Sequence, residues 1–163
     1  MNKLEIQQRV LQNGKPLDLD KFEWDEKTTT FSTNECNLVL DFANINNCIF
    51  KTNSGCFFKT GSDCTFNTGS DCTFKTGSGC SFETDSYCVF YTSNNCTFRT
   101  SYNCVFKTGY FCSFNTGSDC TFKTESNCSF KTGSDCTFNT GYFCSFNTGS
   151  DCTFKTGSGC KFL

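Results

Sequence analysis

Histidine is absent from the 163-residue sequence, and proline, methionine and tryptophan each occur once. Without histidine, the chain lacks the side chain most often used for acid–base catalysis. The first residues lack the apolar segment of a secretory signal, and no apolar run is long enough to cross a bilayer. We therefore expect a protein that is not an enzyme, is not secreted and does not contact a membrane.

A strong excess of one charge is also missing, since the net charge is −2. Residues 1–47 carry five basic and eight acidic residues, a net of −3, and residues 48–163 carry nine and eight, a net of +1. The second segment therefore lacks the basic row that phosphate binding requires, and it also lacks the acidic surface of a DNA mimic. We expect no nucleic-acid partner.

The sequence does contain an eight-residue repeat, Cys-x-Phe-x-Thr-Gly-Ser-Asp, which is most regular over Cys112–Cys160. Fifteen cysteines stand eight residues apart over Cys48–Cys160. Phenylalanine takes position 3 over Phe50–Phe162, and threonine takes position 5 over Thr52–Thr156. A fixed short period is typical of a solenoid, in which each repeat packs only on its neighbours.

Each octad predicts one strand of five residues followed by a three-residue turn. Positions 1, 3 and 5 (Cys, Phe, Thr) share one face of the strand, which we expect to be buried, and positions 2 and 4 share the wet face. Because the repeated threonine points inward, we do not expect a threonine array that binds ice. Gly-Ser-Asp predicts the turn, since glycine accepts a positive φ. Position 6 is not always glycine, so we expect no conformation there that is open only to glycine.

Two features indicate that two octads, or sixteen residues, form one coil. Serine and threonine alternate at position 2 over Ser113–Thr153, and the turn Tyr110-Phe111 recurs 32 residues later as Tyr142-Phe143. We therefore predict an all-β fold: a right-handed β-solenoid, or β-helix, with two facing parallel sheets. Facing strands run in opposite directions, so the core should be a double column of phenylalanine rings.

These octads resemble the octapeptide-repeat β-helix proteins of Marseillevirus-type giant viruses. The resemblance covers residues from about 40 to 163. It implies a β-solenoid fold, a viral origin and no known catalytic activity, and it supplies no functional residues. The expectation that follows is a structural or virion-associated protein, located in the virion or the host cytoplasm.

Residues 1–39 do not fit the octad and are interpreted as an N-terminal cap, with the solenoid over residues 40–163. A first coil needs a cover, because its backbone groups would otherwise form an open sheet edge. The aromatic residues Phe22, Trp24 and Phe31 favour a cap over the alternative of a disordered tail. Cys36 is out of register with the other cysteines and belongs to this cap.

The sixteen cysteines raise two chemical alternatives, metal binding and disulfides. Zinc sites use cysteines two to four residues apart that converge on one point, whereas cysteines of stacked coils form a line with a spacing of about 4.8 Å. We expect no metal and no cofactor. The line spacing suits a disulfide, but side chains in register point the same way, so we expect mostly free, buried thiols.

The sequence ends within a repeat, and the residues Cys160, Phe162 and Leu163 are the candidate end for self-association. A strand edge and half-covered rings would favour a homodimer through this coil. The expected function is therefore a rigid rod that associates with itself or presents a surface.

The alternative is a binding module for a viral or host protein. Its candidate contact residues are the aromatic turn residues Tyr110, Phe111, Tyr142 and Phe143, which should lie about 10 Å apart on one edge. Val89 and Val105 are outward-facing apolar residues one coil apart, and they indicate either a second contact patch or ordinary strand surface.

Overall fold

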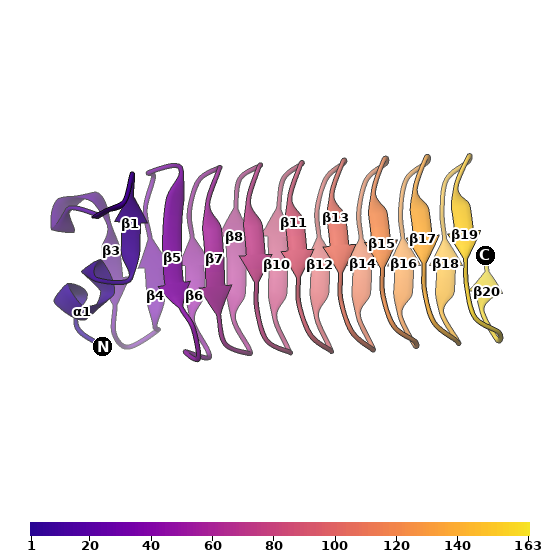
Figure 1. Ribbon diagram of the computed structural model, residues 1–163, viewed down its shortest axis with the longest axis horizontal. Helices are drawn as coiled ribbons and strands as arrows, with labels where there is room; N and C mark the ends of the chain where they lie inside the picture. Colours follow the sequence, from indigo (N-terminus) through magenta and orange to yellow (C-terminus); the bar gives the residue numbers. More distant parts are fainter.

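The alternation within each octad produces one short strand per octad, and successive strands alternate between two sheets. The computed structural model describes residues 1–163 and is a straight rod of stacked coils (Figure 1). Each strand of the repeat pairs in parallel with the strand two octads later, as Phe106 does with Phe122. The prediction of a β-solenoid with two parallel sheets and sixteen-residue coils is confirmed.

Sheet A has ten strands. They are β1 (Val10–Gln12), β2 (Lys15–Pro16), β5 (Leu38–Phe42), β7 (Phe57–Thr60), β9 (Thr73–Lys75), β11 (Val89–Tyr91), β13 (Val105–Lys107), β15 (Thr121–Lys123), β17 (Thr137–Asn139) and β19 (Thr153–Lys155). From β5 onward, all neighbours in this sheet are parallel.

Sheet B faces it and also has ten strands. They are β3 (Glu23–Asp25), β4 (Thr30–Ser32), β6 (Ile49–Lys51), β8 (Thr65–Thr68), β10 (Ser81–Thr84), β12 (Thr97–Arg99), β14 (Ser113–Asn115), β16 (Ser129–Lys131), β18 (Ser145–Asn147) and β20 (Lys161–Phe162). Most strands have three residues, which is shorter than the five expected. Hydrogen bonding continues beyond them, since Thr121 N–H donates to the Cys104 carbonyl at 2.9 Å.

The core is the expected double column of phenylalanine rings. Within one column, the rings of Phe106 and Phe122 are parallel, with centroids 4.8 Å apart. Across the two columns, Phe106 and Phe114 meet edge to face at 5.2 Å and 77°. Such pairs contribute about 0.5–1.5 kcal/mol each beyond the burial of their area. Every ring therefore packs against its own column and against the facing one.

The turns differ from the prediction in where the backbone takes a positive φ. The positive φ lies at position 8, as at Asp119 (58°), and not at the glycine of position 6. Position 6 therefore has no conformation that is open only to glycine, as expected. Glycine is favoured there by space, because a Cβ at Gly133 would lie 2.9 Å from the backbone nitrogen of Ser118 in the preceding coil. The same close approach lets Ser134 N–H donate to Ser118 Oγ at 3.1 Å.

Residues 1–29 lie over the first coil, which begins with β4, at the N-terminal end of Figure 1. Helix α1 (Lys3–Gln7) and the 3-10 helix η1 (Leu19–Lys21) belong to this segment, and neither is long enough to cross a bilayer. Strand β1 pairs antiparallel with β5, and β3 pairs antiparallel with β4. Ile6, Val10 and Leu17 are buried in the same core as the repeat. The parallel register begins at β4, within the segment that the sequence assigns to the cap.

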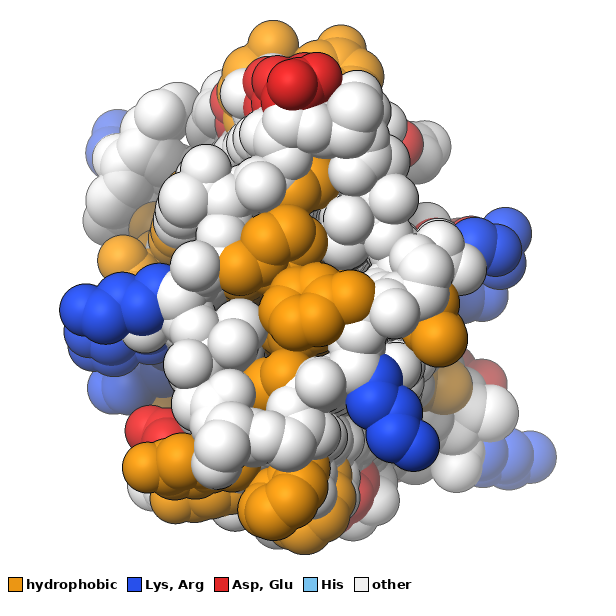
Figure 2. Space-filling view, turned by 90° about the vertical axis from the view of Figure 1, so that its right-hand side faces the viewer, with side chains coloured by type: hydrophobic (Ala, Val, Ile, Leu, Met, Phe, Trp, Pro, Cys, Tyr) orange, Lys and Arg blue, Asp and Glu red, His pale blue; other side chains and the backbone are white.

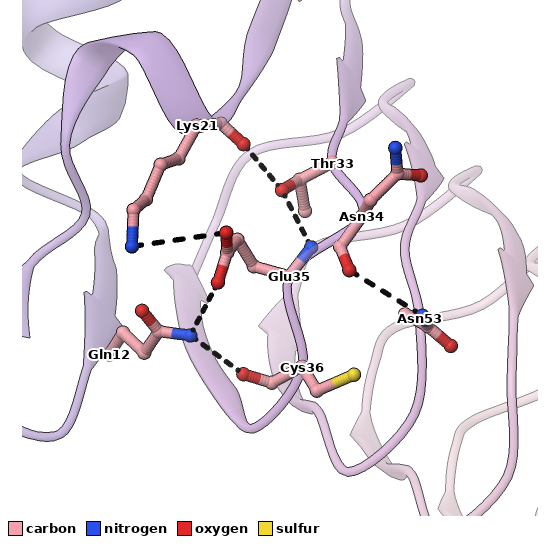
Figure 3. Close-up of polar contacts among 7 residues, drawn as sticks. All are labelled: Gln12, Lys21, Thr33, Asn34, Glu35, Cys36 and Asn53. Carbon is pink, nitrogen blue, oxygen red and sulfur yellow. Dashed lines mark hydrogen bonds and ion pairs between the residues drawn. The ribbon is translucent and has the colours of Figure 1, made fainter.

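Polar contacts also tie this segment to the first coil (Figure 3). Gln12 Nε2 donates to Glu35 Oε2 at 3.0 Å and to the Cys36 carbonyl at 3.1 Å. Glu35 also lies 3.9 Å from Lys21 Nζ, and Thr33 Oγ1 donates to the Lys21 carbonyl at 2.6 Å. The sulfur of Cys36 points away from these contacts, outside the ladder of the other cysteines.

Candidate functional site

The four aromatic turn residues lie on one edge of the rod, which we call the aromatic edge (Tyr110, Phe111, Tyr142 and Phe143). The first pair lies in the turn between β13 and β14, and the second in the turn between β17 and β18. One turn separates them: Phe111 N–H donates to the Ser126 carbonyl, and Asn127 N–H donates to the Tyr142 carbonyl. The two pairs are therefore two coils apart, or about 10 Å, as the repeat predicts.

Phe111 and Phe143 combine exposure with an unfavourable backbone conformation. Their side chains are 60% and 67% exposed, and their φ angles are 58° and 57°. Position 8 on the same edge of the other coils holds Asn, Asp or Gly, which tolerate a positive φ. A bulky residue there costs about 1–2 kcal/mol. Exposed rings held in a strained conformation are a mark of a functional surface.

The coil after the second aromatic pair has small residues beside the rings. A Cβ at Gly157 would lie 2.6 Å from Tyr142 Cδ1, and a Cβ at Gly159 would lie 2.6 Å from Phe143 Cδ1. Any side chain at either position would displace a ring. The turn Gly157–Gly159 thus leaves room for these rings along the edge, which sequence reasoning did not anticipate.

The opposite edge carries a smaller aromatic pair that sequence reasoning also missed. Tyr87 and Tyr102 lie in successive turns there, with ring centroids 5.6 Å apart at 77°. Tyr87 occupies the same position 8 as Phe111, with φ 60°. The signal was present in the sequence, because Tyr87 stands where most octads have Asp, Asn or Gly.

The other two predicted surfaces are exposed to different degrees. In the last coil Phe162 is 57% and Leu163 82% exposed, and Cys160 is half-buried. Val89 and Val105 are paired neighbours on β11 and β13, as expected, and only Val105 is largely exposed. The larger apolar surfaces are therefore the aromatic edge and the last coil.

All sixteen cysteines are free thiols, and thirteen of them are buried. Each ladder sulfur donates to backbone carbonyls, as Cys120 Sγ does to Ser118 at 3.4 Å. Hydrogen bonds with the thiols of Cys104 and Cys72, together with burial, raise the pKa of the Cys88 thiol above its ordinary value. No three Cys, Asp or Glu side chains converge to form a metal-binding group.

Charge is sorted by position on the rod. Of the basic residues over 48–163, five lie on the outer face of sheet A and four on that of sheet B, whereas all the acidic residues except Glu83 lie in turns. Figure 2, which looks along the rod from its C-terminal end, shows blue side chains on both faces and overlapping red side chains at one edge. Sheet A therefore carries a basic row, and the expectation that residues 48–163 have none is wrong. The net charge of this segment is small because the basic residues on the sheets and the acidic residues in the turns cancel in the sum.

Comparisons with protein-family models, with curated proteins and with solved structures found no match to this chain.

Proposed function

We propose that the protein is a non-catalytic structural rod that holds its aromatic edge for contact with another protein. The observation that carries this proposal is the pair Phe111 and Phe143, exposed at positions where the backbone disfavours a large side chain. Aromatic residues are enriched at the centres of protein interfaces. A rod whose only task was to stay folded would be better served by Asn or Asp at both positions.

The core supports the mechanical part of this proposal. One continuous cluster of 34 buried residues runs through the rod, so the coils share a single core. Two surface points fixed on this core keep their separation. The aromatic pairs are thus presented at a constant spacing of two coils, which favours a partner with two matching contact points.

A second copy of the chain is the first partner to consider. Phe162 and Leu163 of the last coil present a further exposed apolar surface next to the unpaired sides of β19 and β20. An open strand edge pairs readily with another chain. We include a homodimer of the 163-residue chain in the proposal. A virion-associated location is also part of the proposal, and it rests on the resemblance of the octads alone.

Light scattering across a concentration series, with and without reductant, tests the proposal. We expect a reductant-insensitive dimer for the unmodified chain and a monomer for the double variant Phe111→Asn, Phe143→Asn. Tyr87→Asn is the matched control, because it removes an aromatic residue from the same turn position on the opposite edge, and it should remain dimeric. Phe162→Ser tests the last coil: a monomer from this variant, with the double variant still dimeric, would place the dimer contact at the last coil and not at the aromatic edge.

A chain that stays monomeric at every concentration contradicts the dimer. A pull-down from infected or host-cell extract then tests the aromatic edge against a foreign protein, using the same double variant and the same control. If the double variant captures the same proteins as Tyr87→Asn, the aromatic edge is not a binding surface.

A further inference from the structure

A single file of lysines runs along the outer face of sheet A. The lysine row consists of Lys59, Lys75, Lys107, Lys123 and Lys155, and Tyr91 and Asn139 take the two remaining places. Neighbours in the row are in parallel register, so the row follows the rod axis with one residue per coil. Six coil steps of about 4.8 Å give a length of about 29 Å. All five lysines are exposed.

The row is almost free of counter-charges. Only Lys59 has an acidic partner, Asp41 at 3.9 Å, and both side chains of that pair are more than half exposed. Lys75 lies over the ring of Phe57, 5.5 Å from its centroid. The remaining lysines make no ion pair, because the acidic residues of the rod lie in the turns. Their charges are therefore available to an anion in solution.

Tyr91 interrupts the row between two shallow depressions of the surface. One depression is lined by Lys59, Lys75 and Tyr91, and the other by Tyr91, Lys107 and Glu125, each together with polar turn residues. The ring of Tyr91 is 45% exposed. Hence an aromatic face stands between a hollow with two lysines and a hollow with one lysine and one carboxylate.

We propose that this face of sheet A binds single-stranded nucleic acid, with its phosphates along the lysine row and one base stacked on Tyr91. Proteins that bind single strands without sequence preference combine a cationic track for the backbone with aromatic side chains for the bases. The row supplies both elements. The inference is independent of the aromatic edge and goes beyond the proposed function, since it concerns another surface and another class of partner.

The straightness of the row favours a single strand over a duplex. In a duplex, each strand winds around the axis, so a flat face meets its phosphates only where a strand crosses that face. Sheet A has no helix or long loop on its outer side that could enter a groove. An extended strand, in contrast, can place successive phosphates along all five lysines.

The magnitudes favour nucleic acid over a second copy of this chain. Asp119, Asp135 and Asp151 form an acidic row with the same spacing on the edge where sheet B leads into sheet A. Exposed lysine–carboxylate pairs contribute about 0.2–1 kcal/mol each, whereas association costs about 4–15 kcal/mol. A few such pairs do not hold two rods together. Nucleic acid releases condensed counterions when its phosphates are neutralised, which makes five cations sufficient for measurable binding.

The test is fluorescence anisotropy with a labelled 20-nucleotide oligothymidylate in 50–200 mM KCl at pH 7. Five phosphate contacts predict a slope of log K against log salt of about −3.5, at roughly −0.7 per contact on single strands. Lys75→Gln, Lys107→Gln, Lys123→Gln should reduce the slope to about −1.4. The matched control Lys51→Gln, Arg99→Gln, Lys131→Gln removes the same charge from sheet B and should keep the original slope.

Further variants test the base contact and the local charge. Tyr91→Ser should weaken binding roughly five- to hundredfold with the slope unchanged, because stacking does not release counterions. Glu125→Gln should tighten binding, because it removes the carboxylate that lines the second depression. Exposed positions on a regular sheet tolerate these changes, and thermal melting of each variant verifies the fold.

Four results would overturn the inference: no binding at 50 mM KCl, equal slopes for the two triple variants, a duplex of equal length bound as tightly as the single strand, or polyglutamate of equal charge competing as well as oligothymidylate. The last result would show attraction to any linear polyanion. None of the four depends on the aromatic edge, so failure here leaves the proposed function intact.

Discussion

The rings of Phe106 and Phe122 are separated by sixteen residues in the sequence, yet they lie 4.8 Å apart and within 3° of parallel. The spacing equals that of neighbouring strands in a sheet, so the rings follow the backbone ladder step by step. Each ring is completely or almost completely buried and also meets two rings of the facing column edge to face. The stability of the rod therefore depends on every member of the double column.

Removal of one interior ring should leave a cavity that the ladder cannot close. We expect Phe106→Ala to lower the free energy of unfolding by about 3–5 kcal/mol, because both neighbouring coils are held at strand spacing. Phe162→Ala, at a ring that is 57% exposed, should cost much less. Urea denaturation monitored by circular dichroism measures both. Equal losses for the two variants would contradict the continuous column.

Replacement of Phe143 by asparagine should relieve backbone strain. Asparagine tolerates the φ of 57° found there, so we expect Phe143→Asn to raise the free energy of unfolding by about 0.5–1 kcal/mol. Asn127→Ala, at the same turn position one coil earlier, should lower it by a similar amount. A marked loss of stability in Phe143→Asn would show that the ring serves the fold rather than a partner.

The native protein should expose only three thiols to modification. Cys36, Cys152 and Cys160 are partly exposed, and the other thirteen are buried. Brief treatment with iodoacetamide under native conditions, followed by mass spectrometry, should show up to three adducts on these cysteines, whereas the unfolded chain should show sixteen. If the partly exposed cysteines resist labelling without reductant and become labelled when reductant is added, they form disulfides.

Stability should fall steeply at alkaline pH. Hydrogen bonds to neighbouring ladder thiols, together with burial, raise the pKa of seven buried thiols, namely those of Cys48, Cys56, Cys80, Cys88, Cys96, Cys120 and Cys128. The same hydrogen bonds lower the pKa of the partner thiols Cys64, Cys72, Cys104, Cys112, Cys136 and Cys144. A thiol in the unfolded chain ionises near pH 8.5. Below that pH both states keep the proton, and this stabilisation is complete. Above it, these seven thiols lose protons only in the unfolded chain, so each of them lowers the free energy of unfolding by up to about 1.4 kcal/mol per pH unit.

Urea denaturation at pH 7, 8, 9 and 10 checks this dependence. We expect the free energy of unfolding to fall steeply above pH 8.5. The slope between pH 9 and 10 counts the thiols that ionise only on unfolding. A free energy of unfolding that is unchanged from pH 8 to 10 would contradict the raised pKa values.

The positions of the aromatic edge could be predicted from the sequence, but its conformation could not. Tyr110-Phe111 and Tyr142-Phe143 stand 32 residues apart, and a sixteen-residue coil places them on one edge. The positive φ of Phe111 depends on which turn residue reverses the chain. The glycine at position 6 suggested that the positive φ lies there, two residues earlier. The structure shows that this glycine accommodates the preceding coil, a contact between turns sixteen residues apart.

The sequence by itself determined the architecture of this protein, because a strict eight-residue period leaves each octad few partners other than its neighbours. The buried Cys-Phe-Thr face, the two sheets and the ring columns all follow from that period. Only the tertiary structure decided where the charges lie. Net charge sums over all positions, whereas the coil sends alternate octads to opposite sheets and places position 4 outward and position 8 at an edge. Five of the nine basic residues over 48–163 thereby lie in one row on sheet A and four lie on sheet B, while the aspartates lie in the turns.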